Sequence, residues 1–169
     1  SILFLTSASS DIATLSNTVS LPKYSSLSGK IRALSLQNLN HPAQIDHYLS
    51  TTASKAKVII LRLLGGRGHW NYGLEQLRLW EEGNNTRHLV ILAGTKDEFS
   101  ELHSLGSINT KLANKLADLL ISGGVTNMKL FLEKIIDLRD HKSVDYANIV
   151  VENIEDPIKW DWKEELNPK

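Results

Sequence analysis

The residues with the greatest chemical potential in this sequence are concentrated between positions 62 and 75. This stretch combines cations, an imidazole, two aromatic rings and several glycines, whereas an ordinary strand-to-helix connection needs about two to six residues and little chemistry. Binding residues tend to gather on loops that a rigid scaffold holds in place. The candidate binding residues of this stretch are Arg62, Arg67, His69, Trp70 and Tyr72.

The two arginines each have two interpretations. As binding groups, Arg62 and Arg67 would donate paired hydrogen bonds to carboxylates of a ligand. As structural groups, they would form salt bridges with a nearby acid such as Glu75. We favour the structural interpretation for Arg62, which directly follows an apolar run, and the binding interpretation for Arg67, which glycines flank.

The aromatic residues and the histidine also leave alternatives open. Trp70 and Tyr72 would stack on a flat ligand, bury their rings against the sheet with the polar tips outward, or pack on another domain. His69 is a candidate binding residue and not an expected metal ligand, because the chain has no cysteine and no second histidine lies at ligand spacing. We predict no catalytic residue and no metal site.

The glycines of the stretch do not form a known phosphate-binding motif. A dinucleotide fingerprint beginning at Gly66 would need glycine at position 71, which is Asn71, and no Gly-Lys-Ser/Thr follows. The glycines instead suit a backbone that turns with positive φ. We therefore assign five residues to loop structure: Gly65, Gly66, Gly68, Gly73 and Glu75.

The elements that must position these residues follow from apolar patterning. Dense apolar runs predict strands at residues 2–5, 31–36, 57–61 and 89–93, and the first three are followed by helical patterns, the third of these at 73–82. Two further helices are expected near 110–122 and 126–138, and an irregular segment with a helical turn at 96–108. Residues 147–151 allow a short strand, but we assign this region to an interdomain tail. We expect Ser9, Ser10 or Asp11 to cap the first helix.

This alternation predicts an α/β fold, flavodoxin-like or Rossmann-like, with a parallel sheet in the order 2-1-3-4, helices on both faces and extra C-terminal helices. In such sheets, ligands bind beyond the carboxyl ends of the strands where the strand order reverses. The loops at residues 6–10 and 64–72 would meet there. The hydroxyls of Thr6, Ser7 and Ser9 therefore join the candidate binding residues.

Composition limits the possible partners and the domain organisation. The 169 residues carry 19 basic and 19 acidic side chains, so no overall charge attracts nucleic acid or anionic membranes. No apolar run approaches the roughly 18 residues of a membrane span, and the absence of cysteine is compatible with the cytoplasm. We expect one domain over residues 1–140 and a polar interdomain tail over 141–169.

The stretch from Arg62 to Glu75 resembles a signature of the large, CobN-type subunit of aerobic, ATP-dependent cobaltochelatase, which is related to the large subunit of magnesium chelatase. About a dozen positions are in register. Weaker similarity extends to the first nine residues, to residues 41–49, and to Gly123-Gly124 with Asn127. His69 departs from the pattern, in which tyrosine or serine is more usual.

This resemblance implies that the chain is the N-terminal domain of a much longer subunit in cobalamin biosynthesis. That subunit inserts cobalt into a corrin, hydrogenobyrinic acid a,c-diamide, with ATP hydrolysed on AAA+ ATPase and adaptor partner subunits. The domain itself would bind no cofactor and would not be catalytic alone. Two alternatives remain: a flavodoxin-like module that binds an anionic ligand or a partner protein without chelatase chemistry, and a structural head whose loop faces protein.

Overall fold

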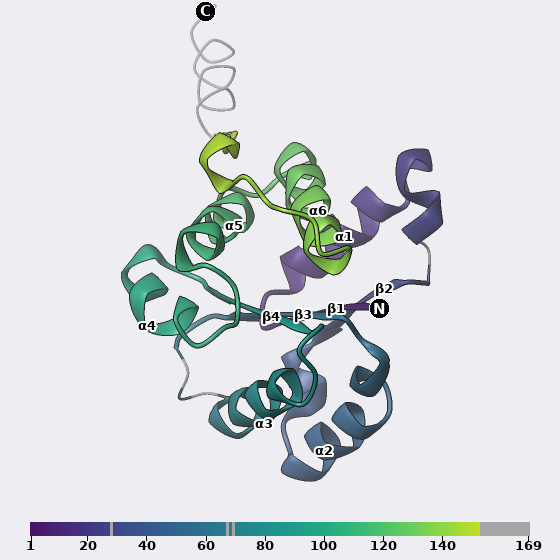
Figure 1. Ribbon diagram of the computed structural model, residues 1–169, viewed down its shortest axis with the longest axis vertical. Helices are drawn as coiled ribbons and strands as arrows, with labels where there is room; N and C mark the ends of the chain where they lie inside the picture. Colours follow the sequence, from purple (N-terminus) through teal and green to yellow (C-terminus); the bar gives the residue numbers. More distant parts are fainter. Residues whose placement is uncertain (28, 67, 69, 153–169) are drawn as a thin grey trace, which may run out of the picture.

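The fold is built on a four-stranded parallel sheet, as predicted. The computed structural model describes residues 1–27, 29–66, 68 and 70–152. The strands lie in the order β2-β1-β3-β4 (Figure 1). They are β1 (Ile2–Thr6), β2 (Ile31–Ser35), β3 (Val58–Leu63) and β4 (His88–Ala93).

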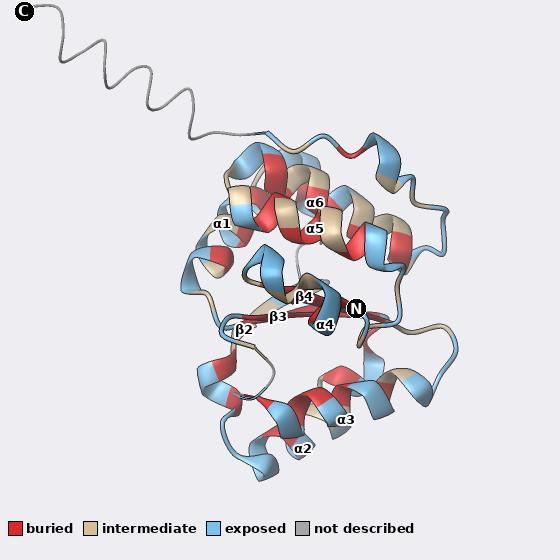
Figure 2. Cartoon of the chain, turned by 90° about the vertical axis from the view of Figure 1, so that its left-hand side faces the viewer, coloured by how far each residue is buried: buried red, intermediate tan, exposed pale blue. Residues whose placement is uncertain are grey.

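The sheet is covered by helices on both faces (Figures 1 and 2). One face carries α1 (Ser9–Val19), α5 (Thr110–Ser122) and α6 (Val125–Arg139), and the other carries α2 (Pro42–Ser50) and α3 (Asn71–Glu82). All residues of β1 and β3 are buried. A strand covered on both faces needs apolar side chains on both, which explains the dense apolar runs of the sequence.

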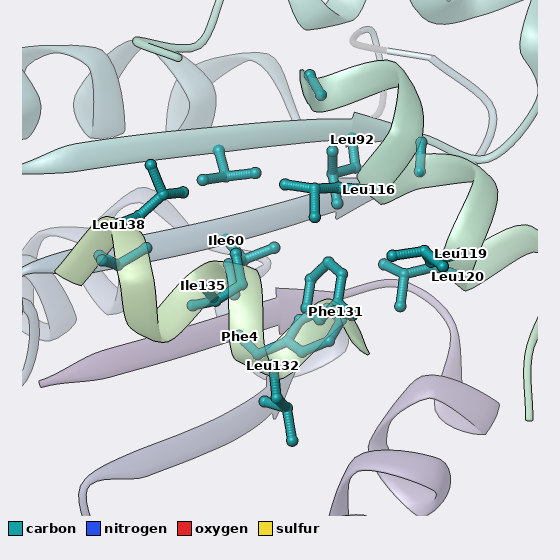
Figure 3. Close-up of a cluster of buried hydrophobic side chains, with 14 of the residues drawn as sticks. Phe4, Ile60, Leu92, Leu116, Leu119, Leu120, Phe131, Leu132, Ile135 and Leu138 are labelled. Carbon is teal, nitrogen blue, oxygen red and sulfur yellow. The ribbon is translucent and has the colours of Figure 1, made fainter. Parts of the chain in front are cut away.

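Two apolar clusters lie on the opposite faces of the sheet. Below α1, α5 and α6, the rings of Phe4 and Phe131 lie with centroids 5.8 Å apart, and leucines and isoleucines of α5 and α6 surround them (Figure 3). On the other face, Leu74, Leu77 and Trp80 of α3 pack on the alternate residues of the strands. Because successive strand residues point to opposite faces, β3 contributes Ile60 to the first cluster and Leu61 to the second.

The connections contain short 3₁₀ helices. These are η1 (Pro22–Leu27), η2 (Leu36–Leu39), η3 (Ala53–Lys55), η5 (Lys96–Glu98) and η6 (Tyr146–Asn148). The helical turn expected within residues 96–108 is present as η5 followed by α4 (Phe99–His103), which lies beside β4. No helix in the described part of the chain combines the length and apolar character that a bilayer span requires.

The segment after α6 does not use the alternative of a short strand at 147–151. Tyr146–Asn148 form a 3₁₀ turn there, with no strand partner among the described residues. Ile149 is nevertheless buried in the cluster of α5 and α6. The division between residues 140 and 141 stays a prediction, and most of the expected tail, residues 153–169, lies outside the described residues.

Candidate functional site at the carboxyl edge of the sheet

A buried ion pair lies under the carboxyl ends of β1 and β3, where the strand order reverses. Arg62 Nη1 lies 2.5 Å from Asp11 Oδ1, and the hydroxyl of Thr6 donates to Asp11 Oδ2 over 2.8 Å. Arg62 is 6% exposed, Asp11 5% and Thr6 1%. The acid expected to pair with Arg62 was Glu75, but the partner is Asp11, and Glu75 is exposed on α3.

The same contacts change how α1 begins. The N-cap residue is Ala8, so the prediction that the side chain of Ser9, Ser10 or Asp11 caps this helix is wrong. Thr6 Oγ1 instead accepts a hydrogen bond of 3.0 Å from the Ala8 N–H. Asp11 stands in the first helical turn, where its charge favours the helix dipole, but its carboxylate is directed to Arg62 and Thr6.

Ser7 connects the ends of the two central strands. Its main-chain N–H donates to the Arg62 carbonyl over 3.2 Å, and its hydroxyl accepts from the Leu64 N–H over 3.0 Å. The two loops predicted to meet at the switch point therefore do meet. Ser9, one residue beyond Ala8, is exposed at the start of α1.

The glycines shape the loop that follows β3. Gly65 and Gly66 have φ of +85° and +87°, a region that favours glycine, as predicted. Gly73 is required for another reason: a side chain there would meet the Trp70 ring at 2.5 Å. Gly68 is exposed, and no atom of the described residues beyond its chain neighbours lies within 4 Å of the place that a Cβ would take. Arg67 and His69 lie outside the described residues.

The two aromatic residues of the loop are used internally. Trp70 is 7% exposed, and its Nε1 donates to the Leu39 carbonyl over 2.9 Å. Tyr72 is 39% exposed, and its hydroxyl donates to Asp46 Oδ1 of α2 over 2.7 Å. This hydrogen bond to a carboxylate raises the pKa of Tyr72. Trp70 thus offers no free ring face in this conformation, whereas the ring of Tyr72 is partly accessible.

A second motif borders the same edge of the molecule. Gly123 ends α5, Gly124 precedes α6, and both have positive φ. Asn127, 1% exposed, donates to the carbonyls of Gly123 and Glu152 over 2.8 Å each. A hollow of about 270 Å³ separates this junction from α1, and Ser10, Asp11 and Thr14 line its other side. Sequence reasoning did not include these residues in the site, because only the tertiary fold brings α1 to the α5–α6 junction.

Another residue that sequence reasoning missed is His103, which is 1% exposed at the edge of β4. Its Nε2 accepts from the Ala93 N–H over 3.0 Å, and its Nδ1 lies 2.7 Å from Asn114 Oδ1. Because Nε2 accepts, Nδ1 carries the proton and donates to Asn114. Burial lowers the pKa of His103. No local sequence pattern marks this histidine, since its partners come from β4 and α5.

The described residues contain no cluster of three or more histidine or acidic side chains that could hold a metal ion. At the carboxyl edge of the sheet, the exposed residues include Ser7, Ser9, Gly65, Gly68 and Tyr72. Such groups donate and accept hydrogen bonds at neutral pH without titrating, so they are suited to holding a ligand or a partner surface.

Comparisons with known proteins relate this fold to cobaltochelatase. No family model matches the chain. Over 60% of its length, the chain is 33% identical to the aerobic cobaltochelatase subunit CobN of Pseudomonas aeruginosa. Over 61% of its length, it is 30% identical to the subunit of the same name from a Sinorhizobium species. The chain spans about 8% of the length of each of these curated relatives.

A solved structure shares the fold. The catalytic subunit of cobaltochelatase from Mycobacterium tuberculosis superposes with a TM-score of 0.65 over 89% of this chain and 11% of that one. At 17% identity, this likeness shows the fold alone. The relation to magnesium chelatase stays a prediction. Together, the two sequence matches and the shared fold support the identification of this chain as a CobN-type fragment.

Proposed function

We propose that this chain is the N-terminal domain of a CobN-type subunit and contributes to ATP-dependent insertion of cobalt into a corrin in cobalamin biosynthesis. The observation that carries the proposal is the sequence match to two CobN subunits. Cobalt and the corrin, hydrogenobyrinic acid a,c-diamide, are substrates. ATP is hydrolysed on AAA+ ATPase partners, which act together with adaptor subunits in the cytoplasm. This domain itself binds neither ATP nor a cofactor.

The part assigned to this domain is contact with the corrin periphery at the carboxyl edge of the sheet. A corrin precursor carries carboxylates and amides, which hydrogen-bond donors recognise. Thr6 and Arg62 are engaged in the buried ion-pair network, so they act by holding the two loops in place. Direct contacts are assigned to Arg67 and His69, which lie outside the described residues, and to Ser9 and Tyr72, which are exposed.

A second candidate role is a contact between domains of the same subunit. It is favoured by the aromatic residues of the loop, since Trp70 is buried and Tyr72 is bonded to Asp46 of α2. A loop whose rings are held by its own domain presents a preformed surface, which suits docking of protein as well as ligand. In this role the corrin would lie elsewhere in the subunit.

The experiment that separates the two roles is a calorimetric titration of the 169-residue chain with the metal-free a,c-diamide corrin. Arg67→Ala is compared with Arg78→Ala, which removes an exposed arginine from the body of α3 and keeps the net charge of the two variants equal. We expect Arg67→Ala to weaken the Kd by about tenfold or more, which is about 1.4 kcal/mol, and Arg78→Ala to leave it nearly unchanged.

Two outcomes would contradict corrin binding at this edge. Equal weakening by both variants would show a general effect of charge. Absence of binding by the chain, together with normal binding by a full-length subunit that carries Arg67→Ala, would favour the interdomain role. Thermal unfolding of each variant checks that a loss of binding does not come from a loss of fold.

A further inference from the structure

The two edges of the sheet are treated differently by the rest of the chain. In β4, the register places the main-chain groups of Leu89, Ile91 and Ala93 on the outer side, since the His88 N–H donates inward to Lys57. The N–H of Leu89 donates to Ser107 Oγ over 2.8 Å, and its carbonyl accepts from the Ser107 N–H over 2.8 Å. The Ala93 N–H is bonded to His103. The chain itself therefore bonds the outward groups of Leu89 and Ala93 at the two ends of this edge.

The other edge is open. Ile2 of β1 donates to the Lys30 carbonyl over 3.0 Å and is paired with Ile31, so the main-chain groups of Arg32 and Leu34 point toward β1. Those of Ile31 and Ala33 consequently point away from the sheet. Within the described part of the chain, no residue forms a hydrogen bond with these outward groups. Open strand edges are templates for pairing with another strand.

An apolar groove runs along the same edge. It has a volume of about 250 Å³ and lies between α1 and β2. Its lining is Ile12, Leu15, Ser16 and Val19 of α1 with Ile31 and Ala33 of β2. Ile31 and Ala33, whose outward main-chain groups form no hydrogen bond with the described residues, thus also line the groove.

We propose that an extended segment from the remainder of the CobN-type subunit adds to the sheet beside β2. Main-chain hydrogen bonds to Ile31 and Ala33 would hold the segment, and its alternate apolar side chains would fill the groove, as in recognition by strand addition. Arg32, exposed on this strand, and Lys30 before it favour acidic residues at one end of the added strand. This inference rests on the proposed function, because the chain spans about 8% of the length of its CobN relatives and the occupant comes from the rest.

Residue-resolved hydrogen exchange tests the proposal with an internal control. The outward amides of Ile31 and Ala33 are compared with the inward amides of Arg32 and Leu34, in the 169-residue chain and in the full-length subunit that contains it. We expect the inward amides to be protected in both proteins. The outward amides are expected to exchange rapidly in the chain and at least about tenfold more slowly in the full-length subunit.

A pair of variants sharpens the test. Ala33→Pro removes an outward N–H that the described residues leave unused, and proline is tolerated at strand edges. Ala33→Val keeps that N–H. In the full-length subunit, Ala33→Pro is expected to abolish the added protection of Ile31, whereas Ala33→Val retains it. Both variants of the 169-residue chain should unfold at temperatures close to the wild type.

Two results would overturn the proposal. Rapid exchange of Ile31 and Ala33 in the full-length subunit would show that no strand is added there. If the outward amides are already protected in the isolated chain, and this protection increases with protein concentration, the edge would be assigned to a second copy of this chain. Neither result depends on corrin binding, so failure of the titration described above and failure of this test are distinguishable.

Discussion

The two faces of the sheet are held by different kinds of contact. On the face of α1, α5 and α6, the packing around Phe4 and Phe131 is almost wholly apolar. The buried ion pair of this face, between Arg62 and Asp11, lies at the carboxyl edge of the sheet. On the face of α2 and α3, directional hydrogen bonds accompany the apolar contacts. Trp70 and Trp80 donate to carbonyls of the β2–β3 connection over 2.9 and 2.8 Å, and Tyr72 donates to α2.

The difference follows from the elements on each face. α5 and α6 have 13 and 15 residues and bury continuous apolar stripes, so packing alone orients them. α2 has nine residues, of which Ile45 alone is buried, and it lies between short 3₁₀ turns. The indoles of Trp70, at the N-cap of α3, and of Trp80, within α3, donate to carbonyls of those turns and hold them in place. The candidate binding loop begins where the two arrangements meet, at the end of β3.

Breaking the buried ion pair between Asp11 and Arg62 should lower the free energy of unfolding more than any other change considered below. Asp11→Ala leaves the Arg62 guanidinium buried without its charged partner, which costs about 3–5 kcal/mol of unfolding free energy. The double variant Asp11→Leu with Arg62→Met removes both charges and should recover most of this loss. Urea denaturation of the single and double variants measures both values. A loss below about 1 kcal/mol for Asp11→Ala would mean that apolar packing alone fixes α1.

Removing one directional hydrogen bond from the opposite face should have a smaller effect. Trp80→Phe keeps an aromatic ring but removes one of the two donors to the Ala53 carbonyl, which still accepts from the Ala56 N–H over 3.1 Å, at a cost of about 1 kcal/mol. Leu79→Ala, at a 59% exposed position of the same helix, is the matched control. Urea denaturation gives the energies, and hydrogen exchange should show faster opening of residues 53–56 than of α6. Equal opening of both regions would remove the distinction between the faces.

The smallest change in the free energy of unfolding is expected from the titration of His103 at the edge of β4. Burial lowers the pKa of His103 from the ordinary value of 6.5, so the fold favours the neutral ring that accepts from Ala93. The unfolded chain binds more protons below about pH 6.5, and stability therefore falls as the pH decreases from there. Asp118 faces His103 and acts in the opposite direction.

The measurement is the free energy of unfolding at pH 7.5 and 5.5 for the wild type and for His103→Gln. The variant should lose less stability between the two conditions. His88, whose pKa is also lowered by burial and by His141, contributes in the same direction, so His88→Gln serves as a parallel comparison. An identical pH dependence in wild type and His103→Gln would assign the effect to other groups.

The sequence predicted the scaffold well and the contacts of the site poorly. The apolar runs at residues 58–61 and 89–93 marked central strands because burial on both faces demands apolar residues, a property that local sequence expresses. The glycines at 65 and 66 likewise marked a local backbone conformation. The partner of Arg62 was missed because Asp11 lies 51 positions away, and its position in the first helical turn resembled a cap.

The sequence by itself determined the order of the strands and helices, the parallel sheet with its switch point, and the positions of the loops that meet there. The periodicity of apolar residues and the residue preferences of turns are local properties, so they can be recognised without knowledge of the fold. Only the tertiary structure decided that Trp70 is buried under Leu39, that His103 bonds one end of the β4 edge, and that the edge of β2 is left open. These features depend on groups brought together from distant positions, where packing and hydrogen-bond geometry select the partner.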